Sequence, residues 1–218
     1  MDTMPEPLKG HWEAIDEEVV WLHGRWIIYR QLFGTSPERV ELLNESAATF
    51  FFIIQTVLLN DVQLTLSKLA DPTMTSGRQN LTLESLVKDI DQLGDATLRR
   101  EVDGMRADYQ DRCRAVRHRR NKQLAHFDLA TLIAGKNAPL PGPSRQEIEA
   151  ALGVLRLFMN TLQQKFTHSE TAYDQFILRS DGDQLLSVLK EGLRYEELVD
   201  AGSVAWNDML EHSKNHGT

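Results

Sequence analysis

The chain has 218 residues and a formal net charge of −8, with 41% hydrophobic and 26% charged residues, a composition typical of soluble globular proteins. A single cysteine, Cys113, excludes an internal disulfide framework and a cysteine-rich zinc module. The N-terminus lacks the basic and apolar regions of a signal peptide, and the longest apolar run, Ala47 to Leu59, is too short to span a bilayer. We therefore expect a cytoplasmic protein that does not enter a membrane.

Apolar spacing predicts helices almost throughout the chain, with no convincing strand-like alternation. The second predicted helix runs from about Pro37 to Leu69 and stops before Asp71-Pro72, since proline disfavours a helical residue before it. Its middle is apolar all round, so we expect it at the centre of a bundle. The first predicted helix, about His11 to Phe33, carries a stripe with the 3-4 spacing that packs one helix along another. The stripe consists of Trp12, Ile15, Val19, Leu22, Trp26, Tyr29 and Phe33.

A polar loop over Thr73–Asn80 precedes a short predicted helix, about Leu81–Leu93, and a long one, about Ala96–Phe127. Ser144, with Glu147 three residues later, predicts a capping box that opens a further helix to about Thr167. Glycines punctuate the remaining fifty residues into shorter predicted helices. These are Ala172–Leu178, Asp183–Lys190, Tyr195–Val199 and Val204–His212.

The predicted fold class is therefore all-α: an up-and-down bundle of four to five main helices with a C-terminal appendage of short helices. We expect residues 1–168 to form the bundle and residues 169–218 to pack on the same domain as an extension. The proline-rich loop at Ala134–Pro143 is interpreted as a connection within the bundle, because the helices on both sides are strongly amphipathic.

The charges are unevenly distributed. The net acidity argues against a dedicated duplex-DNA binder, which carries a basic footprint. One segment is nevertheless strongly basic and contains no acid, and the rest of the chain carries a charge of −14. The six cations of this segment are Arg112, Arg114, Arg117, Arg119, Arg120 and Lys122.

Helical positions single out the end of the long predicted helix. At about 100° per residue, Arg120 falls inside the apolar stripe, and Arg119 and His126 lie together at one edge of it. One explanation is structural: Arg120 pairs with a carboxylate, and His126 is a satisfied histidine near a helix end. Asp61 falls inside the apolar stripe of the second helix, and a buried lone carboxylate is costly, so Asp61 is the expected partner of Arg120.

The segment RNKQLAH, from Arg120 to His126, resembles the arginine–polar–histidine signature of HEPN proteins, with Arg120, Asn121 and His126 on the motif positions. The segments LLNDVQLTLSKLADP and RHRRNKQLAHFD are similar to the abortive-infection (phage-resistance) branch of that superfamily. The resemblance extends over about Trp12 to Phe166. The spacing is one residue longer than in the commonest form of the motif, and Arg119 also satisfies the permitted range, so either arginine is a candidate.

The resemblance implies an all-α, cytoplasmic homodimer whose two motifs form a composite cleft that cleaves RNA without a metal or another cofactor. His126 would move protons, since imidazole has a pKa of about 6.5, and Arg120 would stabilise charge developing on phosphorus. Asn121 would orient the phosphate or the histidine. The backbone of the RNA would be held by Arg117, Arg119 and Lys122.

The resulting hypothesis is an endoribonuclease of a defence or toxin–antitoxin system that leaves a 2′,3′-cyclic phosphate, with a cognate antitoxin as a candidate partner. The alternative is a non-catalytic helical module that binds a nucleotide or a protein partner in the same cleft. The acidity of most of the chain favours this alternative, and the Arg–Asn…His arrangement favours the enzyme. A plain dimerisation domain comes third.

Other sequence patterns give weaker evidence for a functional site. His212 and His216 have a metal-compatible spacing but no third ligand, and Asp181-Gly182-Asp183 begins like a calcium loop without the remaining ligands. We therefore expect no metal site. Cys113 lies on the apolar stripe and is interpreted as a core residue. The aromatic residues Trp12, Trp21 and Trp26 are interpreted as packing or dimer contacts.

Overall fold

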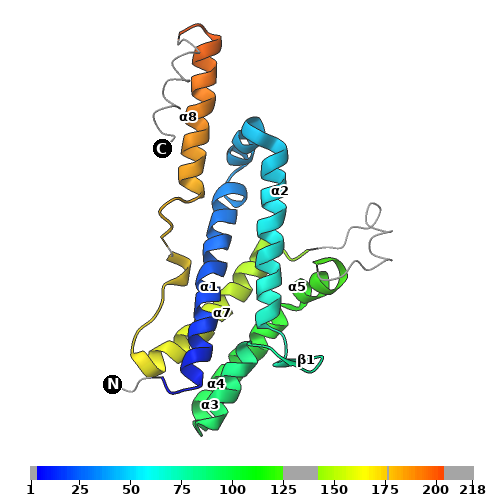
Figure 1. The fold of residues 1–218 in the computed structure, drawn as a ribbon, viewed down its shortest axis with the longest axis vertical. Helices are drawn as coiled ribbons and strands as arrows, with labels where there is room; N and C mark the ends of the chain where they lie inside the picture. The colour runs from blue at the N-terminus through cyan, green and yellow to red at the C-terminus, as the bar shows by residue number, and fades with distance from the viewer. Residues whose placement is uncertain (1–3, 125–141, 176, 204–218) are drawn as a thin grey trace. The chain divides into compact units, whose positions relative to one another are not determined.

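A computed structural model describes residues 4–124, 142–175 and 177–203 (Figure 1). These ranges are almost entirely helical, which confirms the all-α prediction. The predicted helix at 204–212, His126, His212 and His216 lie outside the described residues. The chain divides into two units, one with Met1–Ile27 and Val57–Ile177 and the other with Ile28–Thr56 and Leu178–Thr218. This division differs from the expected boundary at residue 168.

The first unit contains most of α1, the C-terminal part of α2, and every later element up to residue 177. Its helix α4 packs against both α3 and α7. The elements are α1 (Leu8–Tyr29), α2 (Pro37–Leu69), β1 (Met74–Thr75), β2 (Arg78–Gln79), α3 (Leu83–Gln92), α4 (Ala96–Arg112), α5 (Arg114–Arg119), the π-helical turn η2 (Arg120–Leu124), α7 (Arg145–Thr167) and the 3₁₀ turn η3 (Tyr173–Gln175).

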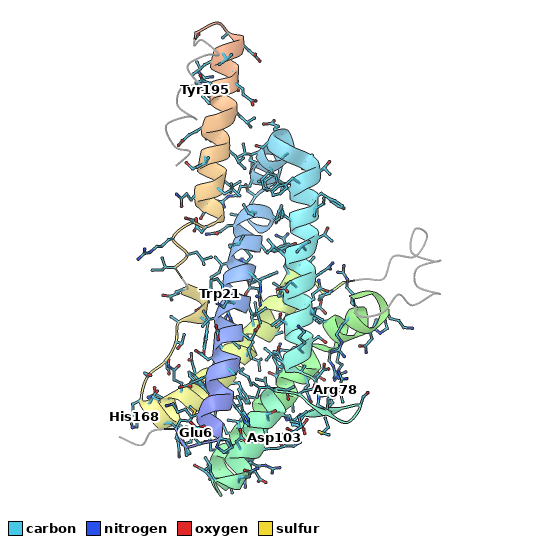
Figure 2. The ribbon with its side chains drawn as sticks, in the orientation of Figure 1. Glu6, Trp21, Arg78, Asp103, His168 and Tyr195 are labelled. Carbon is cyan, nitrogen blue, oxygen red and sulfur yellow. The ribbon has the colours of Figure 1, made fainter. Side chains whose placement is uncertain are left out.

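The predicted stripe of α1 is buried in the core of the chain itself. Val19 and Leu22 are fully buried, and Trp26 is 3% exposed. Helix α7 contributes to this cover, because Trp12 Nε1 donates to the carbonyl of Met159 at 3.4 Å. The stripe therefore packs inside one molecule, and it no longer argues for a dimer. Of the tryptophans considered as dimer contacts, Trp21 is half exposed (Figure 2).

The capping box predicted at residue 144 begins α7. The Glu147 amide donates to Ser144 Oγ at 3.1 Å, and the Ser144 amide donates to Glu147 Oε2 at 2.7 Å. The helix ends at His168, whose φ of 56° is left-handed. This element therefore has the start and the end that the sequence indicated.

The predicted polar loop at 73–80 is a short hairpin in which Met74 pairs with Gln79 and Thr75 with Arg78. Ser76 and Gly77 both have positive φ, 51° and 77°, as a two-residue type I′ turn requires. A hairpin of two-residue strands has no alternation long enough to be read from the sequence.

The second unit contains the π-helical turn η1 (Arg30–Gly34), the N-terminal part of α2, and α8 (Gly182–Asp200). Its core consists of Leu32, Leu43, Phe51 and Leu186. The two short helices predicted at 183–190 and 195–199 are wrong, because α8 runs through both. The glycine between them, Gly192, costs a helix about 1 kcal/mol relative to alanine, which is too little to end one that packs in a core.

Helix α2 has the predicted bounds, but the backbone of Ala47 is not helical (φ −165°, ψ 71°) and divides it into two helical segments. The prediction that its middle is buried is wrong. By length and composition alone it could cross a membrane, and 11% of that stretch is buried. This stretch of α2 contains few charged residues, although its uninterrupted apolar run is short. The cytoplasmic location of the protein therefore stays a prediction. Within α2, the large apolar side chains that are at least half exposed are Phe50, Phe52, Ile53 and Val57.

Candidate functional site

Arg120 and Arg117 converge on one carboxylate, that of Asp71. Arg120 Nη1 donates to Asp71 Oδ2, and Arg117 Nη2 lies 3.5 Å from Asp71 Oδ1. Asp71 follows α2 directly, at the turn that Pro72 imposes. The end of α2 thus positions both arginines. The side chains of Arg120 and Asp71 are 17% and 21% exposed, which agrees with the structural expectation that Arg120 enters an apolar stripe and needs an acid.

The expected partner, Asp61, is the wrong acid. Asp61 Oδ2 lies 2.8 Å from Nε of Arg25 on α1, and its side chain is 44% exposed. Asp61 precedes Asp71 by ten residues, about 15 Å along a helix. The helical positions that placed Asp61 opposite Arg120 were calculated for one uninterrupted helix over residues 96–127. The helix is instead interrupted at Cys113, where α4 ends.

The motif begins in a π-helical turn. The chain continues from α5 into η2, so Arg120, Asn121 and Lys122 occupy a turn that is wider than an α-helical one. π-Helical turns are rare and frequently occur at functional sites. Arg120 Nε donates to Asn121 Oδ1 at 3.0 Å. The Asp71 and Asn121 contacts use Nη1 and Nε, so Nη2 takes part in neither.

Arg119 has different surroundings from Arg120. Its guanidinium lies against Gly142, so closely that a Cβ at that position would collide with it. Gly142 comes shortly before α7, which places Arg119 beside that helix's start. The two candidate arginines therefore differ: Asp71 anchors Arg120, whereas Arg119 contacts backbone.

The site has a net positive charge. Arg117, Arg119, Arg120 and Lys122 lie within six residues, and Asp71 is the acid that pairs with two of them. These five side chains sum to a formal charge of +3 in a chain whose total is −8. A cationic turn of this kind attracts phosphate, and its effect weakens as salt rises.

Behind the site the packing is apolar. Cys113 is fully buried, and burial raises the pKa of its thiol to about 12, so it is a core residue as predicted. The Tyr109 hydroxyl donates to the carbonyl of Leu66 at 2.9 Å, which ties α4 to α2. Burial also raises the pKa of Tyr109. These contacts fix the helix that leads into the motif.

Of the metal candidates, the Asp181-Gly182-Asp183 segment lies within the described residues, whereas His212 and His216 do not. The described residues contain no cluster of three or more His, Cys, Asp or Glu side chains suited to a metal. The Asp181-Gly182-Asp183 segment caps α8, where Asp181 Oδ1 accepts from the Gln184 amide at 3.0 Å. A helix cap therefore explains the residues that resembled the start of a calcium loop.

Sequence reasoning named Arg117 and Arg120 as candidate site residues but missed Asp71, the carboxylate that contacts both. The available signal was its position before Pro72, within the LADP segment, where a helix must end. His126 lies outside the described residues, so its distance from Arg120 and Asn121 is not part of this geometry. Its role stays a prediction.

Comparison with known proteins gives one match. A model of the HEPN family AbiU2 matches residues 5–185, which include α1 to α7, the Asp71–Arg120 pair and the whole arginine–histidine segment. No curated protein and no solved structure matches the chain. The chain therefore belongs to the AbiU2 family of the HEPN superfamily, a family of the abortive-infection type.

Proposed function

We propose that this protein is a metal-independent endoribonuclease of a defence or toxin–antitoxin system, acting as a homodimer. The observation that carries the proposal is the anchoring of Arg120 by Asp71 in a cationic π-helical turn at the start of the HEPN motif. A structural ion pair would need one arginine. Here two arginines share the carboxylate, and the positive charge in excess is available to a phosphate.

The proposed reaction uses the RNA's own 2′-hydroxyl. His126 removes its proton, and the oxygen attacks the adjacent phosphorus. The bond to the 5′-oxygen of the next nucleotide breaks to leave a 2′,3′-cyclic phosphate, and that 5′-oxygen takes up a proton from water to leave as a hydroxyl. Arg120 stabilises the charge on the non-bridging oxygens, because a guanidinium stays protonated and presents a planar fork. Asp71 fixes that fork, and Arg117, Arg119 and Lys122 hold the flanking phosphates.

The homodimer part of the proposal now depends on α2. Phe50, Ile53 and Val57 follow the 3-4 spacing of a helix–helix seam, and each is more than half exposed. No charged residue occurs from Ser46 to Asn60. Light scattering at micromolar concentration should give twice the chain mass of 24.9 kDa, and Ile53→Glu should return the monomer. A wild-type monomer would contradict a composite cleft.

RNA cleavage by purified protein in EDTA tests the activity. The wild type should cleave single-stranded RNA to 2′,3′-cyclic ends, with a rate that depends on pH near neutrality. His126→Ala should abolish cleavage and leave RNA affinity nearly intact, and Arg120→Ala should abolish cleavage. Lys122→Ala and Arg117→Ala should weaken binding and reduce its salt dependence. The cleavage activity of Arg119→Ala shows whether Arg119 or Arg120 is the catalytic arginine.

Two matched controls lie in the same segment. His118 is exposed on α5 and controls for loss of a histidine, and Arg114, 76% exposed, controls for loss of an arginine. Both alanine variants should cleave like the wild type. Equal activity in His126→Ala, or cleavage that requires a metal ion, would overturn the nuclease proposal. Tight binding of a nucleotide or protein without cleavage would then favour the non-catalytic module.

A further inference from the structure

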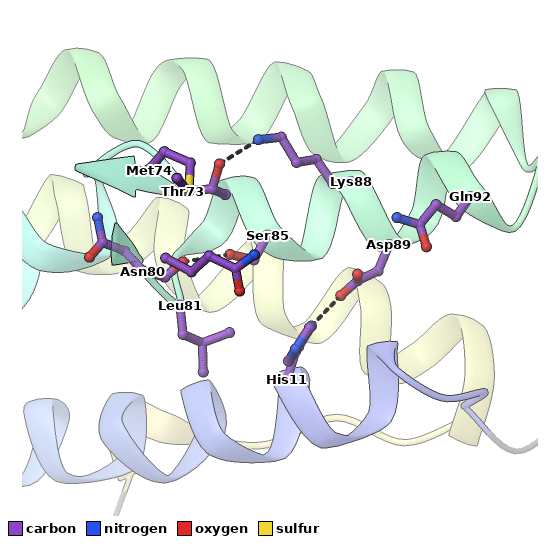
Figure 3. A pocket seen from close by; sticks show the side chains of 10 residues that line it. His11, Thr73, Met74, Asn80, Leu81, Ser85, Lys88, Asp89 and Gln92 are labelled. Atoms are coloured by element: carbon purple, nitrogen blue, oxygen red, sulfur yellow. Dashed lines mark hydrogen bonds and ion pairs between the residues drawn. The ribbon is translucent and has the colours of Figure 1, made fainter. Parts of the chain in front are cut away.

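A polar cavity of about 460 Å³ lies beneath the hairpin, between α1 and α3 (Figure 3). All of its residues belong to the first unit. The proposed reaction uses none of them. They are His11, Thr73, Met74, Gln79, Asn80, Leu81, Ser85, Lys88, Asp89 and Gln92.

One side of this cavity is a histidine–aspartate pair. His11 Nδ1 and Asp89 Oδ2 are 2.7 Å apart, the Asp89 side chain is 7% exposed, and that of His11 is 43% exposed. A buried carboxylate needs such a partner, so Asp89 holds the imidazole in one orientation. Nε2 and the ring face remain outside this contact. The pair gives the cavity a fixed aromatic ring with one unused polar nitrogen.

Three of the six other polar residues of the lining carry carboxamides. Gln79 and Gln92 are exposed, and Asn80 Nδ2 is engaged with Pro72 O at 3.0 Å and Thr75 Oγ1 at 2.8 Å. Lys88 is held by Glu84 Oε1 at 3.0 Å, and it also donates to Thr73 Oγ1. With its cation paired in this way, the cavity suits a neutral polar ligand better than an anion.

Apolar side chains complete the lining. Met74 is 53% exposed and Leu81 is 41% exposed, and both belong to the segment that covers α3. Exposed apolar side chains beside carboxamides suit a flat heterocycle, whose faces pack on apolar or aromatic groups and whose edge forms hydrogen bonds.

The cavity adjoins the arginine site through the backbone. Thr73 lines the cavity, and Asp71, two residues earlier, anchors Arg120. Two residues span at most about 7 Å. When the phosphate of one nucleotide lies at Arg120, the base of the neighbouring nucleotide can therefore reach this cavity.

We infer that the cavity binds one unpaired base of the RNA, next to the phosphate that Arg120 holds, and that it prefers adenine. This inference rests on the proposed function. A carboxamide pairs with an adenine edge through two hydrogen bonds, whereas guanine is read by arginine or lysine, and the cavity's Lys88 is already paired. The base packs against the His11 ring, and Gln79 and Gln92 bind its edge.

The test combines cleavage mapping with binding. Single-stranded RNA of random sequence is digested, and the bases flanking each cut are counted for wild type, Gln79→Ala, Gln92→Ala, and Gln164→Ala as a control from the exposed surface of α7. The wild type should prefer adenine at one flanking position by about tenfold. Each of the first two variants should lose most of that preference. Gln164→Ala should keep it.

Binding is measured without cleavage. Histidine signals in NMR spectra are followed while each of the four nucleosides is added, with His11 assigned through His11→Asn. Adenosine should shift the His11 signal, and Gln92→Ala should suppress the shift.

The outcomes distinguish failure of the base pocket from failure of the nuclease proposal. Cleavage whose base preference is absent, or is unchanged in both glutamine variants, overturns the base pocket and leaves the nuclease standing. If no RNA is cleaved, the nuclease proposal fails. An adenosine-specific shift of His11 that depends on Gln92 then still supports a base site, whereas no shift overturns it.

Discussion

Helices α1 and α2 are the most apolar helices of the chain, yet they end in opposite environments. The apolar stripe of α1 is buried, with Val19 and Leu22 fully covered. The middle of α2 exposes side chains such as Phe52, at 68%. A stripe with polar residues on its other side specifies which face is covered. A segment that is apolar all round specifies no face, so its burial depends on what the rest of the chain supplies.

The largest expected effect separates the two helices directly. Leu22→Ala should reduce the free energy of unfolding by about 2–5 kcal/mol, because it leaves a cavity in a packed core. Ile53→Ala should change it by no more than about 0.5 kcal/mol in the monomer, because the side chain is 52% exposed. Urea unfolding measures both. Equal losses would show that α2 is covered in solution, and a loss that grows with protein concentration would identify a second copy as the cover.

The pH dependence of stability tests whether the apolar face of α1 is buried in solution. His23 is 2% exposed, and burial lowers its pKa to about 4, below the 6.5 of an unfolded chain. The unfolded chain therefore binds more protons between these values, so stability falls as the pH drops from about 6.5 to 4, by about 2–3 kcal/mol.

The measurement compares urea unfolding at pH 7 and pH 4.5 for wild type and His23→Phe. The difference between the two proteins isolates this histidine from carboxyl groups that titrate in the same range. His23→Phe should lose that part of the pH dependence. The same dependence in both proteins would mean that water reaches this face of α1.

A smaller effect contrasts two acids, one on α2 and one just after it. Asp71→Asn removes the charge that Arg117 and Arg120 share in a largely buried position, and should cost about 1–3 kcal/mol. Asp61→Asn removes one partner of a half-exposed pair with Arg25 and should cost less than about 1 kcal/mol. Thermal melts of both variants give the order. The reverse order would restore Asp61 as the important partner.

The smallest effect concerns α7, which covers α1. Ser144→Ala removes one half of the capping box and should cost about 1 kcal/mol. Thr56→Ala, on the exposed part of α2, should instead stabilise by a few tenths of a kcal/mol, since alanine is the better helix former and the Thr56 hydroxyl donates to the carbonyl of Phe52 in the same helix. Opposite signs in one set of melts would confirm that α7 depends on its cap. A destabilising Thr56→Ala would indicate a further contact at that residue.

Local chemistry accounts for what the sequence predicted. The bounds of α2 follow from Pro37 and Pro72, and Ser144 with Glu147 defines the start of α7. Arg120 was expected to be largely buried and to pair with an acid, and its side chain is 17% exposed and contacts Asp71. The contacts that sequence reasoning missed join distant segments: Arg120 to Asp71 across 49 positions, and His11 to Asp89 across 78. Periodicity gives the face of a residue on its own helix, not which distant face meets it.

The π-helical turn at Arg120 has a consequence for the length of the motif. A turn closed by hydrogen bonds from residue i to i+5 contains one more residue than an α-helical turn. The segment from Arg120 to His126 is also one residue longer than the commonest HEPN form. An insertion taken up inside a widened turn leaves the preceding helix and the Asp71 contact unrotated. Removing one residue between Arg120 and His126 should therefore convert the turn to ordinary α-helix and keep the arginine in place, because the change in length is confined to the turn.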